Sequence, residues 1–147
     1  MSRRSLLLSA CVCCFVSAVA SRVGANAPPG RYTVTSTTVY DNYTKLTWMR
    51  TVPGTTYPWS QAIAYCSGLG GAWRLPTVKE LQTLFDVTQS GGFDPVAFPK
   101  APTANYWSIT PTAGSVSSLA WAVSFGINNF RAIWQSQSTT SYARCVQ

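Results

Sequence analysis

Histidine is absent from this 147-residue sequence, and acidic residues number only four. The missing histidines exclude imidazole general bases, Ser-His-Asp triads and histidine metal ligands. The four acids are Asp41, Glu80, Asp86 and Asp94, which leaves few side chains for a pair of catalytic carboxylates. No sequence pattern typical of a catalytic serine occurs either. We therefore expect no metal site, no cofactor and no catalytic residue.

Charge of either sign is scarce, since charged residues make up 10% of the chain, but the balance is positive at +7. A modest positive charge favours acidic partners such as an anionic polysaccharide. No run of Lys or Arg occurs after residue 20, so nucleic acid is not an expected partner, and scattered solvent-exposed charges are the plainer alternative.

Residues 1–20 have the pattern of a secretory signal peptide. Arg3 and Arg4 precede an apolar stretch over residues 6–19, and Ala18-Val19-Ala20 supplies a small-residue cleavage pattern. The apolar stretch is too short for a membrane span, so we expect no transmembrane segment in the mature chain. These features predict export to the periplasm, the cell surface or the medium.

Two further predictions concern this end of the chain. Leu8-Ser9-Ala10 before Cys11 resembles a lipobox, which makes lipid anchoring at Cys11 a minor alternative to plain secretion. Residues 21–31, which include two adjacent prolines, read as a linker, and residues 32–147 read as one domain.

The pattern of apolar residues predicts an α+β domain. Trp59, Ala62, Ile63 and Cys66 recur at helical spacing, and a second helix is expected over 77–85. Short alternating runs predict strands at 32–40, 45–49, 106–110, 119–125, 130–134 and 141–146. The long stretch 86–105 is rich in Gly and Pro, and loops of this length are often functional. Phe93 and Phe98 are expected to anchor it in the core.

The start of the second helix carries the clearest local signal in the chain. Thr77 followed by Glu80 is a capping box, in which each side chain accepts the other residue's backbone N–H. Pro76 keeps Leu75 out of the helix. For Trp73 and Arg74 we favour structural roles, with the Trp buried and the Arg paired with carbonyls or a carboxylate. Contact with a ligand is the alternative.

This segment, WRLPTVKELQTL, resembles the W-R-L-P-[TN]-x-x-E-L-x-x-L signature of the bacterial Lcl C-terminal domain family, a domain of unknown function. Other pieces resemble the family in the same order: Val39-Tyr40-Asp41-Asn42, Trp59 to Cys66, Tyr106 to Thr110, and Arg144-Cys145-Val146, with Ile109 replacing a serine. The resemblance implies a C-type-lectin-like fold, shared with formylglycine-generating enzymes. That fold would pack two helices on short antiparallel strands.

Three of the five cysteines lie in the predicted signal peptide, which leaves Cys66 and Cys145 in the mature chain. Two cysteines in an exported protein suggest one disulfide, here from the first helix to the last strand. C-type-lectin-like domains have such a bridge, so the resemblance supports it; two separate buried thiols are the alternative. Because both cysteines are used in the bridge, formylglycine-generating activity is not expected. The calcium motifs of C-type lectins are also missing.

These observations predict a non-catalytic binding or cell-surface interaction module. The resemblance implies a glycan ligand, because some family members are similar to collagen-like adhesins that bind sulfated polysaccharides; another surface protein is a further possible partner. The candidate contacts are amides of Asn128 and Asn129, the fork of Arg131 and the ring of Trp134. The competing hypotheses are an enzyme that uses Asp86 or Asp94, and a structural subunit of a surface appendage.

Overall fold

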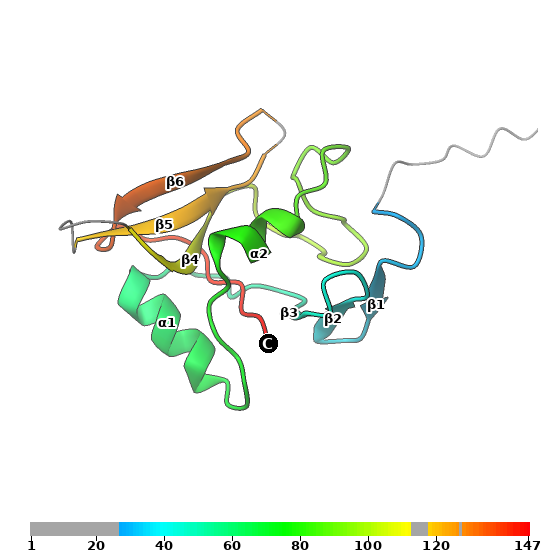
Figure 1. Cartoon of the computed structure of the whole chain (residues 1–147), viewed down its shortest axis with the longest axis horizontal. Helices are drawn as coiled ribbons and strands as arrows, with labels where there is room; N and C mark the ends of the chain where they lie inside the picture. The colour runs from blue at the N-terminus through cyan, green and yellow to red at the C-terminus, as the bar shows by residue number, and fades with distance from the viewer. Residues whose placement is uncertain (1–26, 113–117, 127) are drawn as a thin grey trace, which may run out of the picture.

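The computed structural model describes residues 27–112, 118–126 and 128–147, and within these residues the domain is α+β. It contains two three-stranded antiparallel sheets, ordered β1-β2-β3 and β4-β5-β6, and two helices (Figure 1). The strands are β1 (Tyr32–Val34), β2 (Thr38–Asp41), β3 (Thr47–Met49), β4 (Asn105–Pro111), β5 (Leu119–Ser124) and β6 (Arg131–Ser136), and the helices are α1 (Trp59–Gly68) and α2 (Val78–Thr83). The predicted signal peptide, including Cys11, lies outside the described residues.

The first sheet corrects the prediction of one strand over 32–40. The chain turns back after β1, because the hydroxyl of Thr35 accepts the backbone N–H of Thr38 at 2.9 Å and closes a hairpin turn. The alternation of Thr and Val continues through this turn and hides it in the sequence. The returning strand β3 also begins two residues later than predicted, since Lys45 has a left-handed φ of 64°.

The register of the second sheet places three polar residues in one row. Asn105 of β4 lies opposite Ser124 of β5, and Ser124 lies opposite Arg131 of β6. Directly paired residues in a sheet point to the same face, and the next residue along each strand points to the other. One face at this end of the sheet is therefore polar.

Both helices follow the predicted patterns. In α1, Ala62 and Cys66 are fully buried, while Trp59 and Ile63 pack at the edge of the same apolar cluster. The predicted capping box forms at α2, where Thr77 Oγ1 accepts the N–H of Glu80 at 3.2 Å and Glu80 Oε2 accepts the N–H of Thr77 at 2.7 Å. This helix ends at Thr83, two residues earlier than predicted.

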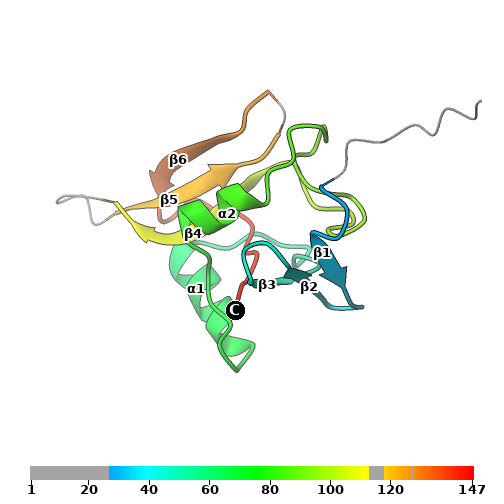
Figure 2. The ribbon, with the colours of Figure 1, turned by 45° about the vertical axis from the view of Figure 1, so that its right-hand side comes forward.

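The C-terminal segment is not the strand predicted over 141–146. It forms isolated bridges with several partners: Ser141 pairs with Tyr57, Tyr142 with Tyr106, and Val146 with both Trp48 and Arg74. Because the partner changes every few residues, no continuous ladder develops. Figures 1 and 2 show the segment, in red, running between the two sheets. It joins the parts of the domain into one body.

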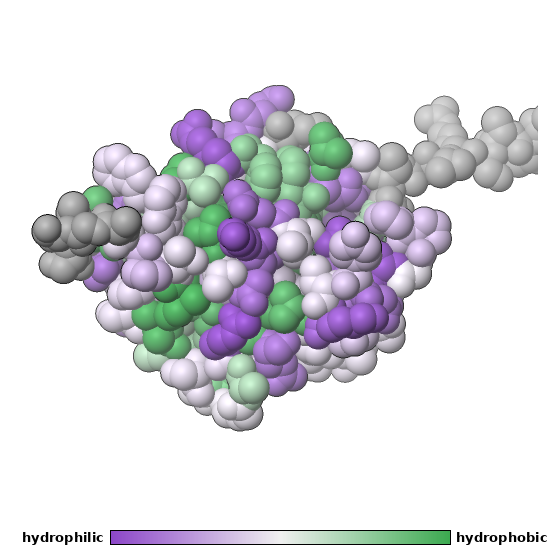
Figure 3. Space-filling model, in the orientation of Figure 1, coloured by the Kyte–Doolittle hydropathy of each residue, from purple (hydrophilic) through white to green (hydrophobic). Residues whose placement is uncertain are grey.

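Two apolar clusters make up the core. The larger one is rich in aromatic rings and includes Phe93 and Phe98 from the long loop, which confirms their role as anchors. The smaller one lies between α1 and the second sheet. It contains the predicted disulfide, which joins Cys66 and Cys145 across 79 residues of sequence. On the face shown in Figure 3, hydrophilic side chains form a band that divides the apolar surface into separate patches. Neither helix of the described residues has the length and apolar character that a membrane span requires.

Candidate functional site

The carboxylates of Asp41 and Glu80 are occupied by arginine side chains. Asp41 is fully buried and accepts a hydrogen bond from Arg31 Nη2 at 3.0 Å. Glu80 receives the fork of Arg74 at 2.7 and 2.9 Å, in addition to its capping contact. Arg74 therefore plays a structural role, and it joins Thr77 and Glu80 of the capping box in one connected set of hydrogen bonds. Its neighbour Trp73 is half-buried at the edge of the smaller cluster.

These contacts change the acidity of both groups. Hydrogen bonds from Arg74 hold the pKa of Glu80 below its usual range. Burial alone would raise the pKa of Asp41, but hydrogen bonds from Arg31 and from the backbone of Tyr43 and Thr44 outweigh it, so the pKa of Asp41 is also lowered. Both carboxylates are held in the ionised form and serve the fold.

Asp86 and Asp94, the residues of the enzyme hypothesis, each close a local turn in the long loop. Asp94 Oδ1 accepts the N–H groups of Val96 and Ala97 at 2.8 and 2.9 Å. Asp86 Oδ1 accepts the backbone N–H of Thr88 at 2.9 Å and also its hydroxyl. Across the part of the chain that the structure describes, no three Cys, Asp or Glu side chains are placed to hold a metal ion.

A pocket of about 410 Å³ opens between the long loop and the connection from β5 to β6. It brings the predicted Asn128 and Asn129 together with polar residues of the long loop. Asn129 Nδ2 donates to Ser124 Oγ at 3.3 Å, which fixes the position of one amide. The residues that line this hairpin pocket are Ser90, Thr103, Ala104, Asn105, Ser124, Phe125, Gly126, Asn128 and Asn129.

The structure separates the other two predicted contacts, Arg131 and Trp134. Arg131 is exposed and lies opposite Ser124 in the sheet, so it belongs to the face that carries the hairpin pocket. Trp134 stands three residues further along β6, and its side chain therefore points to the opposite face. There it lies opposite Trp121 and remains 63% exposed. The prediction of a single surface for all four residues is wrong for Trp134.

A second pocket of about 290 Å³, lined by Thr56, Ala104, Asn105, Thr140, Ser141 and Tyr142, adjoins the first. Three side chains beside it, which sequence reasoning missed, form a chain of hydrogen bonds. Asn105 Nδ2 donates to Gln135 Oε1 at 3.3 Å, and Gln135 Nε2 donates to Ser141 Oγ at 2.6 Å. The alternation of side chains within 130–134 indicates a strand, but only the pairing register of the folded sheet shows which polar residues come into contact.

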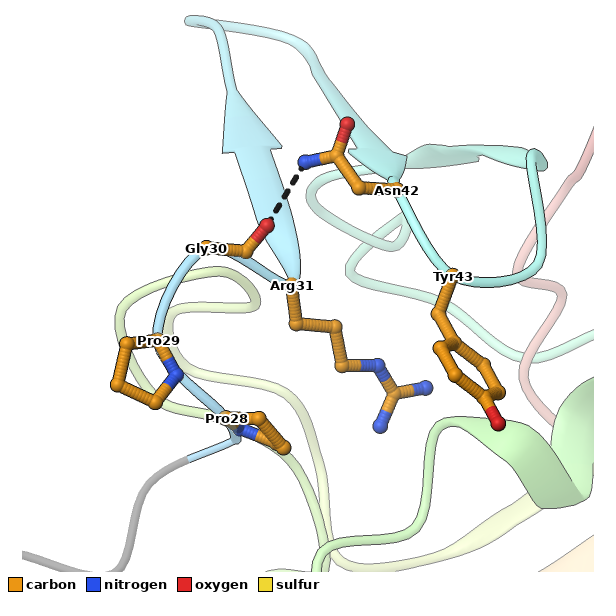
Figure 4. A pocket seen from close by; sticks show the side chains of 6 residues that line it. All are labelled: Pro28, Pro29, Gly30, Arg31, Asn42 and Tyr43. Atoms are coloured by element: carbon orange, nitrogen blue, oxygen red, sulfur yellow. Dashed lines mark hydrogen bonds between the residues drawn. The ribbon is translucent and has the colours of Figure 1, made fainter.

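A third pocket, of about 490 Å³, lies where the chain enters the domain (Figure 4). Pro28 and Pro29 form one side and Tyr43, which is 86% exposed, forms the other. Arg31 extends between them, but its Nη2 is already engaged by Asp41 and by the carbonyl of Thr83. The arginine therefore fastens the start of the domain to the end of α2.

The chain matches a known protein family. A family model, the Lcl C-terminal domain, matches residues 37–147, which include every element from β2 to the C-terminus. No curated protein and no solved structure matches the chain.

Proposed function

Because the chain belongs to the Lcl C-terminal domain family, we propose that it is an exported, non-catalytic module of C-type-lectin-like fold that binds an anionic polysaccharide at the hairpin pocket. The observation that carries this proposal is the make-up of the polar sheet face. Amide and hydroxyl groups line the pocket, and the exposed guanidinium of Arg131 lies in the same row as Asn105 and Ser124.

This chemistry suits a charged sugar polymer. Asn and Gln side chains offer donors and acceptors that match vicinal sugar hydroxyls. Arginine presents a planar fork that matches a sulfate or carboxylate group in two parallel hydrogen bonds. Asp and Glu are missing from the lining, so an anion entering the pocket meets no like charge there.

The non-catalytic part of the proposal is supported by the four carboxylates. Each accepts hydrogen bonds that close a turn, cap a helix or hold an arginine. A carboxylate engaged in this way is a poor proton carrier, because protonation would break contacts that maintain the fold. The enzyme hypothesis based on Asp86 or Asp94 gains no support from their geometry.

The proposal is tested by retention of the mature domain on a heparin column and on a neutral-glycan column across a salt gradient. Arg131→Gln should elute earlier from heparin. Lys79→Gln is the matched control, because Lys79 is exposed near the far end of β4, where the neighbouring Val78 N–H bonds Thr110. Retention on heparin should fall as salt rises, since exposed charges are screened over about 10 Å at 0.1 M. Equal retention on both columns, or equal effects of both substitutions, would contradict the proposal.

A structural subunit is the second candidate, and strand β6 favours it. Among the described strands, β6 pairs only with β5, and it carries the exposed Trp134. Open strand edges template pairing with other chains. Light scattering would decide: a concentration-dependent oligomer that Trp134→Lys abolishes would favour the structural role, whereas a monomer at all concentrations would favour binding.

A further inference from the structure

The two pockets at the polar end of the second sheet form one continuous surface, because both are lined by Ala104 and Asn105. We infer that the ligand is an extended sugar chain that occupies both pockets. This inference rests on the proposed binding function of the hairpin pocket. One of its charged units lies at the hairpin pocket beside Arg131, and an uncharged unit further along the sugar chain lies in the second pocket, so that a disaccharide reaches the hairpin pocket alone.

The boundary between the pockets is built in a fixed arrangement. Gln135 uses both ends of its amide, with its oxygen toward Asn105 and its nitrogen toward Ser141. Ser141 is only 2% exposed and its backbone pairs with Tyr57, so this anchor cannot swing away. Asn105 donates its amide N–H to Gln135 and thereby keeps its carbonyl oxygen as an acceptor. Groups ordered before binding lose less entropy when a ligand arrives.

The distribution of charge indicates which pocket holds the charged sugar and which holds the uncharged one. The second pocket is lined by hydroxyls, one amide and the phenol of Tyr142, without a Lys, Arg, Asp or Glu side chain. At the hairpin end of the surface a charge is available, because Arg131 lies opposite Ser124 in the sheet. An anionic group buried in a neutral pocket would lack the partner that offsets its desolvation. A polymer in which charged and uncharged sugars alternate satisfies both pockets.

Size supports an extended ligand over a single sugar. Ligand sites in proteins commonly enclose about 300–1,000 Å³. The second pocket, at about 290 Å³, and the hairpin pocket, at about 410 Å³, each lie near the lower end of that range. Affinity should therefore rise with the length of the sugar chain until both pockets are filled.

The test uses hyaluronan oligosaccharides, in which a charged uronic acid alternates with an uncharged amino sugar, at lengths of two, four and six units. Calorimetry on the whole mature protein should show affinity rising about tenfold from two units to six, as one or two added hydrogen bonds would give. The double variant Thr56→Ala/Thr140→Ala removes two hydroxyls from the second pocket. The double variant should bind the hexasaccharide several-fold more weakly than the parent does, and its affinity for the disaccharide should be unchanged.

Two outcomes would overturn the inference and leave the binding function in place. One is equal affinity at all three lengths. The other is a hexasaccharide affinity that is tenfold higher for Thr140→Lys than for Gln61→Lys, because that result would place a charged unit in the second pocket. Gln61 lies on the exposed face of α1 and serves as the control. Absence of binding at every length, together with equal retention on the heparin and neutral columns, would overturn the binding function itself.

Discussion

The substitution of Arg144 probes the most unusual contact in the core. This side chain is 0% exposed, and neither ion pair among the described residues involves it. Its Nη1 donates to the carbonyls of Met49 and Arg50 at 2.8 and 3.2 Å. Burial lowers the pKa of Arg144 from its usual value, yet an arginine remains charged in proteins. The cation is instead surrounded by rings.

The guanidinium carbon lies 4.8 Å from the ring centre of Phe98, 5.0 Å from Phe93 and 5.6 Å from Tyr106. Cation–π contacts that are removed from water contribute about 2 kcal/mol. Arg144→Ala would lose these contacts, remove the donor of the Met49 and Arg50 carbonyls at about 0.5–1.5 kcal/mol each, and remove apolar stem worth about 0.8 kcal/mol per methylene. Relief of the buried charge offsets part of this loss. We expect a net destabilisation of about 4 kcal/mol.

Arg144→Met separates the charge from the volume. It keeps an unbranched stem in the cluster but removes both hydrogen bonds and the cation, so we expect a smaller loss of about 1–2 kcal/mol. Urea denaturation followed by tryptophan fluorescence measures both variants. The differences from the parent should be the same at low and high salt, because buried charges are screened little. A methionine variant as stable as the parent would refute the view that the ring and carbonyl contacts outweigh the cost of burying the charge.

Three further outcomes are expected. Thr77→Ala should cost about 1 kcal/mol in urea denaturation, as lost N-caps do, and Thr77→Ser should retain most of the stability; an unchanged midpoint for the alanine variant would show that the cap contributes nothing. Replacing both Cys66 and Cys145 by Ala should cost about 4 kcal/mol, because the bridge closes a loop of about 80 residues in the unfolded chain, and a loss below 1 kcal/mol would count against that account. Folding lowers the pKa values of Asp41 and Glu80, so the stability that these ionised groups contribute is complete above about pH 5 and is lost as the pH falls through their folded pKa values. The urea midpoint should therefore decrease once the pH is below about 4, and it should decrease less in Glu80→Gln.

Local features of the fold could be predicted from the sequence because neighbouring residues decide them. The capping box needs only Thr77 and Glu80 three positions apart, and it forms as expected. The buried face of α1 follows from helical spacing within eight residues. The disulfide was predictable for another reason, since Cys66 and Cys145 are the two cysteines outside the predicted leader.

The features that sequence reasoning missed depend on distant pairing. The row of Asn105, Ser124 and Arg131 exists only because three strands adopt one particular register. A strand shifted by one residue would turn every side chain to the other face. The separation of Arg131 from Trp134 is visible in the sequence as an odd spacing of three, provided that both residues are known to lie in one strand.

The family signature and the C-terminal residues are parts of one contact, although they lie far apart in the chain. The backbone of Arg74 pairs with that of Val146 in both directions, at 3.0 and 2.9 Å, while its side chain holds Glu80 at the start of α2. Val146 also bridges to Trp48 of β3, and the preceding Cys145 is bonded to α1. The segment before α2 therefore forms its final contacts only when the last residues of the chain are in place. We expect removal of Cys145, Val146 and Gln147 to release both the disulfide and this pairing. The truncated protein should lose the cooperative urea transition, while an intact transition would show that the first 144 residues fold without this contact.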